Sequence, residues 1–376
     1  MHRMKWRWLV GLVAALALVG AACGKKGTSG GGGGNANLTK LTLQLKWVTQ
    51  AQFAGYYAAL DQGYYEDAGI DLKILPGGPD ITPEQVVAGG GAEIGIDWLP
   101  SLLVQRDQGV DIVNISQVFT RSGVTEIAWK DTGITSFADM GGKKVGVWCC
   151  GNQYQVFAAL TKNGIDPNDS SQVTIVDQPF DMNLFLNREV DAASAMTYNE
   201  LAQVLEVTGD NGEFPLYTMN DLTVIPLSTV GTAMLEDGLF VRGDWIADKA
   251  HQDLATRFLE ASFKGWVFCR DHFDECLQTV LDNGPTLGEG HQRWQLNEIN
   301  ALIWPADKGI GVMDPDLFQT TNDIASTYGL IKTPATNDSY RTDLAEAAVK
   351  ALEDDGVDVN GNDFQKQTVE VTPGGE

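Results

Sequence analysis

Residues 38–78, LTKLTLQLKWVTQAQFAGYYAALDQGYYEDAGIDLKILPGG, contain the pattern of a strand, a helix and a second strand. Polar and apolar residues alternate in 38–47 and again in 70–75, as expected of β-strands. The stretch 53–69 lacks this alternation, is long enough for a helix and ends at a glycine. A strand, a helix and a strand in this order predict a parallel sheet with helices on its faces.

The same alternation continues along the chain. The sequence predicts a short helix at 82–90, a strand at 92–98, a helix at 99–109 and a strand at 111–119. A second block of alternating strands and helices then runs from about 134 to 224, and the chain after Met234 is mostly helical. We therefore predict an α/β protein with two mostly parallel sheets, one in each block.

Two extended stretches rich in β-branched residues, 123–133 and 221–235, flank the second block. Such paired crossings indicate a domain inserted into another, with hinges near Glu126–Lys130 and Leu222–Val230. The boundaries that follow are 38–130 plus 225–345 for the first lobe and 131–224 for the second. Residues 346–376 are interpreted as an acidic C-terminal tail region.

The N-terminal 22 residues have the pattern of an export signal. Three basic residues precede the apolar run WLVGLVAALALVG, and small residues follow it. Cys23 comes directly afterwards and resembles the acylated cysteine of a bacterial lipobox. Residues 23–37 then form a glycine-rich tether. These features predict a lipoprotein anchored at the outer face of the cell membrane, and the alternative is an ordinary signal peptide with a chance cysteine.

Composition excludes several classes of function. The formal net charge of −24 argues against nucleic-acid binding and against adsorption to anionic lipid. The few cysteines and histidines do not have metal-ligand spacing, so no metal or cofactor is predicted.

Aromatic and polar side chains gather directly after four predicted strands. Ligands of open α/β sheets bind beyond the carboxyl ends of strands, so these clusters should converge. Flat aromatic rings beside amides and carboxylates suit a planar heteroaromatic ring, stacked on its faces and hydrogen-bonded at its edge. The candidate ligand-binding residues are Trp47, Gln52, Tyr56, Asp97, Trp98, Trp148, Asn152, Gln153, Tyr154, Tyr198, Asn199 and Glu200.

Several candidates also have structural interpretations. Tyr56 and its neighbour on one helix cannot both face a pocket, so one of them belongs to the core. Asp97 could cap the following helix, and Glu200 could simply begin one. Lys46 lies next to Trp47 on a predicted strand and should point the opposite way. The site would then lack a free cation, which favours an uncharged ligand over a sulfonate, nitrate or phosphate.

Several longer blocks resemble the solute-binding proteins of ABC importers in the thiamine-pyrimidine-precursor group. The blocks are 45–81, 91–103, 142–155, 189–200 and 302–314. This resemblance implies a two-lobed periplasmic-binding-protein fold of type II, a membrane permease as partner and no enzyme activity. Within the group, IDWLPSLL, the GNQY loop and the run DMNLFL to TYNE most resemble the RibY-type proteins, which implies riboflavin as ligand. The alternative ligand is a thiamine pyrimidine precursor, either hydroxymethylpyrimidine or formylaminopyrimidine.

The cysteines raise two further questions. A related pyrimidine synthase uses a cysteine-rich segment and consumes its own histidine, but Gln52 and Phe53 occupy the position of that histidine here. Cys149 and Cys150 are therefore predicted to be thiols in the pocket floor, since a disulfide between adjacent residues would force a strained turn. Cys269 and Cys276 would be too far apart on one helix, but the residues between them indicate a helix break, so a Cys269–Cys276 disulfide is predicted. The alternative is that all four are free buried thiols.

Overall fold

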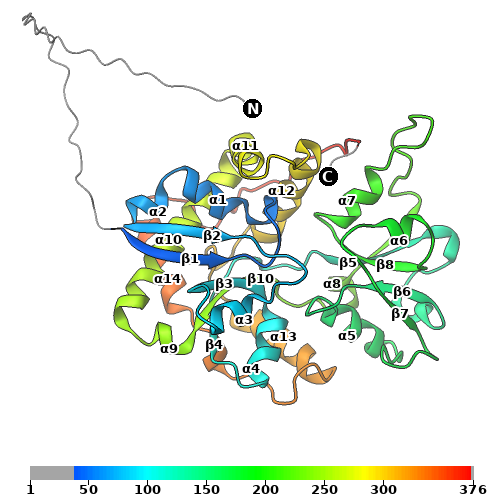
Figure 1. The fold of residues 1–376 in the computed structure, drawn as a ribbon, viewed down its shortest axis with the longest axis horizontal. Coiled ribbons are helices and arrows are strands. Elements are labelled where there is room, and N and C mark those ends of the chain that lie inside the picture. Colours follow the sequence, from blue (N-terminus) through cyan, green and yellow to red (C-terminus); the bar gives the residue numbers. More distant parts are fainter. Residues whose placement is uncertain (1–37, 374–376) are drawn as a thin grey trace, which may run out of the picture. The chain divides into compact units, whose positions relative to one another are not determined.

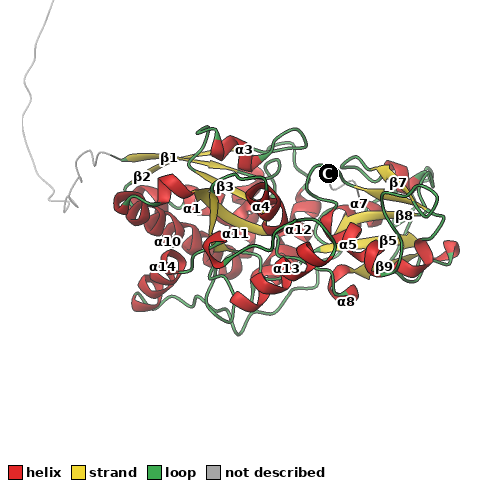
Figure 2. Cartoon of the chain, turned by 90° about the horizontal axis from the view of Figure 1, so that it is seen from below, coloured by secondary structure: helices red, strands yellow, loops and turns green. Residues whose placement is uncertain are grey.

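The computed structural model of the chain describes residues 38–373, which form two sheets flanked by helices (Figures 1 and 2). The first sheet has the strand order β2-β1-β3-β10-β4 and the second has the order β7-β6-β8-β5-β9. No helix within 38–373 is both long and apolar enough to cross a membrane. The predicted signal peptide, Cys23 and tether lie outside the described residues.

The first sheet is parallel except for one strand. β1 pairs in parallel with β2 and β3, whereas β10 runs antiparallel to β3 and β4. Right-handed crossovers place α1 on one face of the sheet, and α3 and α4 on the other. The strands are β1 (Thr39–Gln44), β2 (Ile70–Leu75), β3 (Ile94–Trp98), β4 (Ile112–Gln117) and β10 (Asp237–Arg242).

The helices of the first lobe come from both ends of the described chain. α1 packs on α10 because Gly55 and Gly265 lack side chains where the helices cross. A Cβ at Gly265 would lie 1.9 Å from the Gly55 carbonyl oxygen. The helices are α1 (Ala54–Asp61), α2 (Tyr64–Asp67), α3 (Pro83–Ala88), α4 (Leu99–Asp107), α9 (Gly243–Ile246), α10 (Lys249–Asp271), α11 (Phe273–Asn283), α12 (Glu289–Ile303), α13 (Pro315–Thr327) and α14 (Asp343–Asp354).

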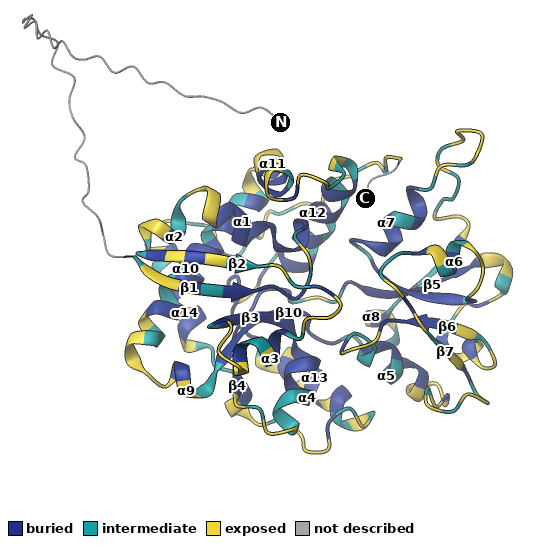
Figure 3. Ribbon diagram, in the orientation of Figure 1, coloured by how far each residue is buried: buried dark blue, intermediate teal, exposed yellow. Residues whose placement is uncertain are grey.

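The second lobe repeats this plan. β6 pairs in parallel with β7 and β8, and the antiparallel strand is β5, which pairs with β8 and β9. β5 is buried along its whole length (Figure 3). The elements are β5 (Val124–Trp129), β6 (Lys144–Val147), α5 (Tyr154–Lys162), β7 (Thr174–Asp177), α6 (Asn183–Leu186), β8 (Ala192–Met196), α7 (Glu200–Leu205), β9 (Leu222–Pro226) and α8 (Leu227–Val230).

The predicted hinge positions need correction. Both predicted hinge strands belong to the second sheet, where Thr125 pairs with Pro226 and Trp129 with Leu222. The chain therefore crosses between lobes earlier and later than expected, in residues 118–123 and 231–236. A β-branched stretch indicated an extended chain, but the sequence pattern did not show which sheet it joins.

One buried carboxylate holds the two crossings together. Glu236 of the second crossing accepts hydrogen bonds from the Gly123 amide at 3.0 Å and from the Ser122 hydroxyl of the first. Gln155 of α5 donates to the same carboxylate at 3.2 Å and accepts from the Met234 amide at 3.0 Å. These bonds link both crossings to the second lobe.

The C-terminal region is not a separate tail. The apolar face of α14, which includes Leu344, Ala348 and Leu352, is buried against α10 and β4. Beyond it, Asn297 of α12 exchanges two hydrogen bonds of 2.9 Å with the backbone of Gln367. The acidic residues noted in the sequence lie partly on the exposed face of α14 and partly in the segment that follows it, which also packs on the first lobe.

The break predicted between Cys269 and Cys276 is present. α10 ends at Asp271, His272 has φ −125° and ψ 60°, and α11 begins at Phe273. The two cysteine Cα atoms lie 5.0 Å apart and the residues form a disulfide, which closes the corner between the helices.

Candidate functional site

Two adjoining cavities lie between the carboxyl ends of the strands of the two sheets. The first, here the aromatic compartment, contains about 380 Å³ of open space and takes its walls from both lobes. Its lining residues are Lys46, Trp47, Gln50, Gln52, Trp98, Trp148, Asn152, Phe180, Met196, Tyr198, Asn199 and Glu200.

The second cavity, here the polar compartment, contains about 880 Å³ of open space and adjoins the first. Both cavities are lined by Lys46, Trp47, Asn152 and Phe180, which therefore mark the boundary between them. The additional walls of the polar compartment are Gly78, Pro79, Ile81, Thr82, Glu84, Asp97, Ser101, Val104, Gln105, Gln108, Cys149, Cys150, Gly151, Gln153 and Tyr154.

Lys46 and Trp47 both line the cavities, contrary to the expectation that Lys46 points away. β1 ends at Gln44, so the alternation of strand side chains no longer applies two residues later. Trp47 packs against Phe180 of the second lobe with ring centroids 4.1 Å apart. The Lys46 ammonium pairs with the buried carboxylate of Asp97 and lies 4.7 Å from the centre of the Trp98 ring. The site thus contains a cation, but Asp97 neutralises it.

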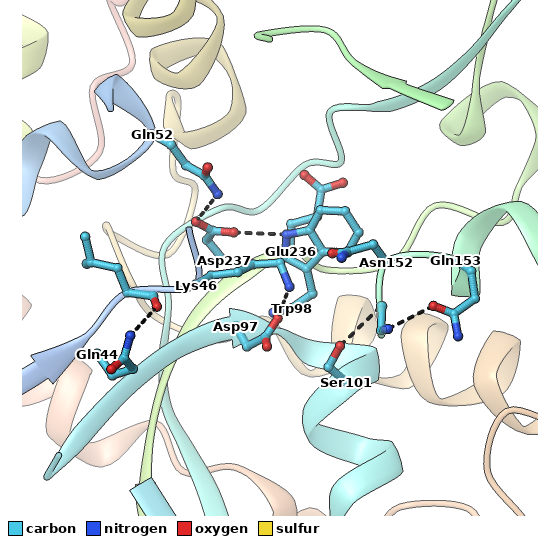
Figure 4. Close-up of polar contacts among 12 residues, drawn as sticks. Gln44, Lys46, Gln52, Asp97, Trp98, Ser101, Asn152, Gln153, Glu236 and Asp237 are labelled. Atoms are coloured by element: carbon cyan, nitrogen blue, oxygen red, sulfur yellow. Dashed lines mark hydrogen bonds and ion pairs between the residues drawn. The ribbon is translucent and has the colours of Figure 1, made fainter. Parts of the chain in front are cut away.

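A hydrogen-bonded chain fixes the first-lobe side of the aromatic compartment. Gln50 donates to Gln52 at 2.7 Å. Gln52 in turn donates to one carboxylate oxygen of Asp237 at 2.9 Å (Figure 4). The Trp98 indole donates to the other oxygen at 3.0 Å. Burial raises the pKa of Asp237 to about 7, although Gln52 and Lys46 partly oppose this effect. Asp237 therefore sets the orientation of both Gln52 and Trp98.

The second-lobe side contains an indole with an unsatisfied donor. Trp148 directly follows β6 and is 4% exposed, and its Nε1 has no hydrogen-bond partner within 38–373. Asn152 lines both compartments and donates to the Cys149 carbonyl at 3.1 Å. Gln153 and Tyr154 line only the polar compartment, where Gln153 accepts a hydrogen bond from the Gly151 amide at 2.9 Å.

Tyr198, Asn199 and Glu200 follow β8 and reach the aromatic compartment together. Glu200 accepts hydrogen bonds from the Met196 amide at 2.9 Å and from Asn199 at 3.0 Å. Burial raises the pKa of Glu200 to about 7, and its hydrogen bonds partly offset the effect. Near neutral pH this carboxyl group can therefore either donate or accept at the edge of a ligand.

His291 of α12 connects this cluster to the first lobe. Its Nε2 atom lies 2.7 Å from the Asn199 side-chain oxygen, and its Nδ1 atom lies 3.0 Å from both carboxylate oxygens of Glu206. All three residues are buried. A polar contact between lobes thus lies one residue away from the candidate ligand contact Glu200.

Tyr56 does not belong to the site. It lies in neither lining set, is 2% exposed and packs edge-on against Trp266 with centroids 5.7 Å apart. The face of α1 that carries Tyr56 is covered by α10, which is the core alternative considered for this residue. The other eleven candidate residues line one or both compartments.

Cys149 and Cys150 form a disulfide with each other, so the prediction of two thiols is wrong. Cys150 has φ 65°, which is the strained turn conformation that was expected to exclude a disulfide between adjacent cysteines. Both residues are exposed and line the polar compartment. Within 38–373, no group of histidine, cysteine and acidic side chains has the arrangement of a metal site.

The fold and the site define the class. Among solved structures, the putative periplasmic sulfonate-binding protein SsuA of Methylobacillus flagellatus superimposes with a TM-score of 0.58 at 16% identity. The match covers 84% of this chain and 96% of that protein. The chain therefore has the two-lobed fold of periplasmic binding proteins. Residues 50–276 match the family model described as NMT1/THI5 like, and the chain belongs to this family.

Curated relatives have two kinds of name. The riboflavin-binding protein RibY of Chloroflexus aurantiacus is 23% identical over 79% of this chain and 83% of its own length. The formylaminopyrimidine-binding protein of Halalkalibacterium halodurans is 21% identical over 65% and 71%. A Schizosaccharomyces pombe relative, 23% identical over 59% and 63%, is named 4-amino-5-hydroxymethyl-2-methylpyrimidine phosphate synthase. The family thus includes proteins named for binding and proteins named for synthesis.

Proposed function

We propose that the protein is the exported solute-binding lipoprotein of an ABC importer, that it captures a small planar vitamin, riboflavin, and that it delivers the ligand to a membrane permease. The observation that carries the proposal is the aromatic compartment. Trp47, Trp98, Trp148 and Tyr198 surround it from both lobes, so a flat ring can be stacked on its faces. A closing two-lobed fold would enclose such a ring between these walls.

The edge of the ring would meet groups that can donate and accept. Asn199 and Glu200 provide an amide and a carboxyl group, and the unpartnered Trp148 indole provides a donor within the described cavity wall. An imide or aminopyrimidine edge presents complementary donors and acceptors. Lys46 is already paired with Asp97, so an anionic group gains little there. These features favour an uncharged heteroaromatic ligand over a sulfonate.

A thiamine pyrimidine precursor is the alternative ligand, because hydroxymethylpyrimidine or formylaminopyrimidine also has a flat ring with polar edges. The relative from Halalkalibacterium halodurans is named for such a ligand. A synthase that consumes its own histidine is less well supported. His251, His272 and His291 are the described histidines, and neither compartment is lined by any of them.

An optical experiment tests the ligand. Riboflavin stacked on tryptophan should lose fluorescence, so titrating micromolar protein into riboflavin should quench the emission to saturation. Protein purified from a riboflavin-containing medium should be yellow. Colourless protein together with unchanged riboflavin emission would contradict the ligand, and binding of formylaminopyrimidine by calorimetry would then support the alternative.

The anchor is tested separately. Cys23→Ser should move the protein from the membrane fraction to the soluble fraction and leave ligand affinity unchanged, because 23–37 is a glycine-rich tether. A matched Ser29→Ala variant in the same tether should remain with the membrane. Continued membrane association of Cys23→Ser would place the attachment elsewhere.

A further inference from the structure

The polar compartment contains a buried acid with an unsatisfied oxygen. Glu84, the second residue of α3, is 1% exposed, and its Oε1 atom has no hydrogen-bond partner within 38–373. Burial raises the pKa of Glu84 well above its usual value, and repulsion from Asp97 raises it further, against the opposing effect of Lys46. This shift favours the uncharged form of Glu84, and its Oε1 atom lies at the cavity wall without a partner among the described residues.

The charges of this compartment cancel. Lys46 is paired with Asp97, and burial favours the uncharged form of Glu84. A phosphate would meet two carboxyl groups and a cation that is already paired, and an amine would find no free carboxylate on these three residues. Balanced charge therefore favours an uncharged occupant.

The helix α4 of the same lobe repeats this chemistry. Ser101, Gln105 and Gln108 lie at i, i+4 and i+7 of the helical segment that begins at Leu99, so they form one polar stripe along the cavity. Hydroxyl and amide groups both donate and accept, as does the uncharged form of the Glu84 carboxyl group. Such a lining matches a chain of hydroxyl groups, because each hydroxyl also donates and accepts.

We infer that the polar compartment is a subsite for a hydroxylated, uncharged side chain carried by the ring in the aromatic compartment. The two compartments share the walls Lys46, Trp47, Asn152 and Phe180, so they adjoin, and a ligand that occupies both must pass between these side chains. This inference rests on the proposed function and adds a selection rule to it. The protein selects a ring with a polyol arm over the bare ring, and Glu84 and Gln105 carry this selection.

The test compares riboflavin with lumiflavin, which has the same ring but a methyl group in place of the polyol. Both probes are fluorescent, so stacking can be followed in the same way for each. Wild-type protein should bind riboflavin roughly ten- to a hundredfold more tightly than lumiflavin, since one or two hydrogen bonds are lost with the arm. Equal affinity for the two would overturn the subsite.

Glu84→Leu should lower riboflavin affinity roughly tenfold and leave lumiflavin affinity unchanged. Retained lumiflavin binding also shows that the variant is folded. Gln105→Leu, at a half-buried position of α4, should have the same selective effect and keeps the test valid if Glu84→Leu fails to fold. The matched control Trp148→Leu should weaken both flavins alike. Equal losses of both flavins in Glu84→Leu and Gln105→Leu, or no losses, would contradict the subsite.

Different results would contradict the proposed ligand and the proposed subsite. If neither flavin binds the wild-type protein, the proposed riboflavin function is wrong. If both bind with equal affinity, the function survives and the subsite is wrong. Flavin mononucleotide should bind more weakly than riboflavin, and tighter binding would show that the compartment selects an anion instead.

Discussion

Both lobes contribute walls to the same cavity, and the two walls differ in how far their polar groups are already hydrogen-bonded. On the first-lobe side, Lys46 is paired with Asp97, and Gln52 and Trp98 both donate to Asp237. On the second-lobe side, the Trp148 indole has no partner among the described residues, and Glu200 titrates near neutral pH. The first wall is preorganised by its internal bonds, whereas the second retains groups that a ligand can satisfy. Within the aromatic compartment, ligand would thus add new hydrogen bonds mainly on the second-lobe side.

The largest expected effect is a loss of stability when Asp237 of the preorganised first-lobe wall is replaced. Asp237→Leu removes the acceptor of Gln52 and Trp98 and leaves two buried donors unpaired, which should lower the free energy of unfolding by about 2–4 kcal/mol. Urea denaturation measures this change. Asp237→Asn keeps one acceptor and should lose less. Wild-type stability in Asp237→Leu would show that this wall is not organised by Asp237.

A substitution in the second-lobe wall should change ligand affinity more than it changes the free energy of unfolding. Glu200→Ala removes a hydrogen-bonding group at the ligand edge and should weaken riboflavin binding by about 1–3 kcal/mol. Its midpoint in urea should change less than that of Asp237→Leu. Fluorescence titration gives the affinity, and Glu189→Ala, on the exposed surface of the same lobe, is the control. An unchanged affinity would remove Glu200 from the site.

In both walls, a buried carboxyl group should contribute less to stability as the pH rises. The pKa values of Glu200 and Asp237 rise from 4.5 and 3.8 to about 7 on folding, chiefly because of burial. The folded protein therefore holds these protons more tightly than the unfolded chain. Their contribution to stability is complete below about pH 4 and is lost as pH rises towards 7 and above.

Glu200→Gln isolates one of these titrations. The variant should gain stability relative to the wild type, on the order of 1 kcal/mol, as the pH of urea titrations rises from about 5 to 8. The free energy of unfolding of each protein at each pH gives the difference. A difference that stays constant across this range, or changes in the opposite direction, would contradict the raised pKa of Glu200.

The smallest expected effect concerns the contact between the walls. Glu206→Gln keeps an acceptor for His291 but removes the charge, so the unliganded protein should open slightly. Small-angle scattering should show a larger radius of gyration without ligand and compaction when riboflavin is added. Glu298→Gln is the matched control, because Glu298 pairs with Lys366 inside the first lobe. Equal radii for Glu206→Gln and wild type would exclude this contact as a closure element.

The parts of the fold with local patterns could be predicted from the sequence. Alternating strands and helices and the inserted second block appear in the structure, but the single helix predicted at 53–69 is divided into α1 and α2 at Gly63. The strand-end rule placed Trp47, Trp98, Trp148 and Glu200 around one cavity, because the carboxyl ends of parallel strands share a sheet edge.

Features that depend on distant partners could not be predicted in this way. Asp237, His291 and Glu84 act through residues more than ten positions away, and nothing in their local sequence indicates those contacts. Lys46 was misplaced because β1 stops before it. Tyr56 was misplaced because a helical pattern with apolar residues on several faces does not show which face another helix covers.

Glu236 has a consequence for the mechanics of the protein. Two separate polypeptide crossings could twist independently, and the lobes could then tilt and slide in several directions. Because the Glu236 carboxylate accepts hydrogen bonds from Ser122 and Gly123 of the other crossing, the two crossings are held together and should move as one hinge. Motion between the lobes should then be restricted to one rotation, and each closing movement would return Trp148 and Glu200 to the same position opposite Trp98.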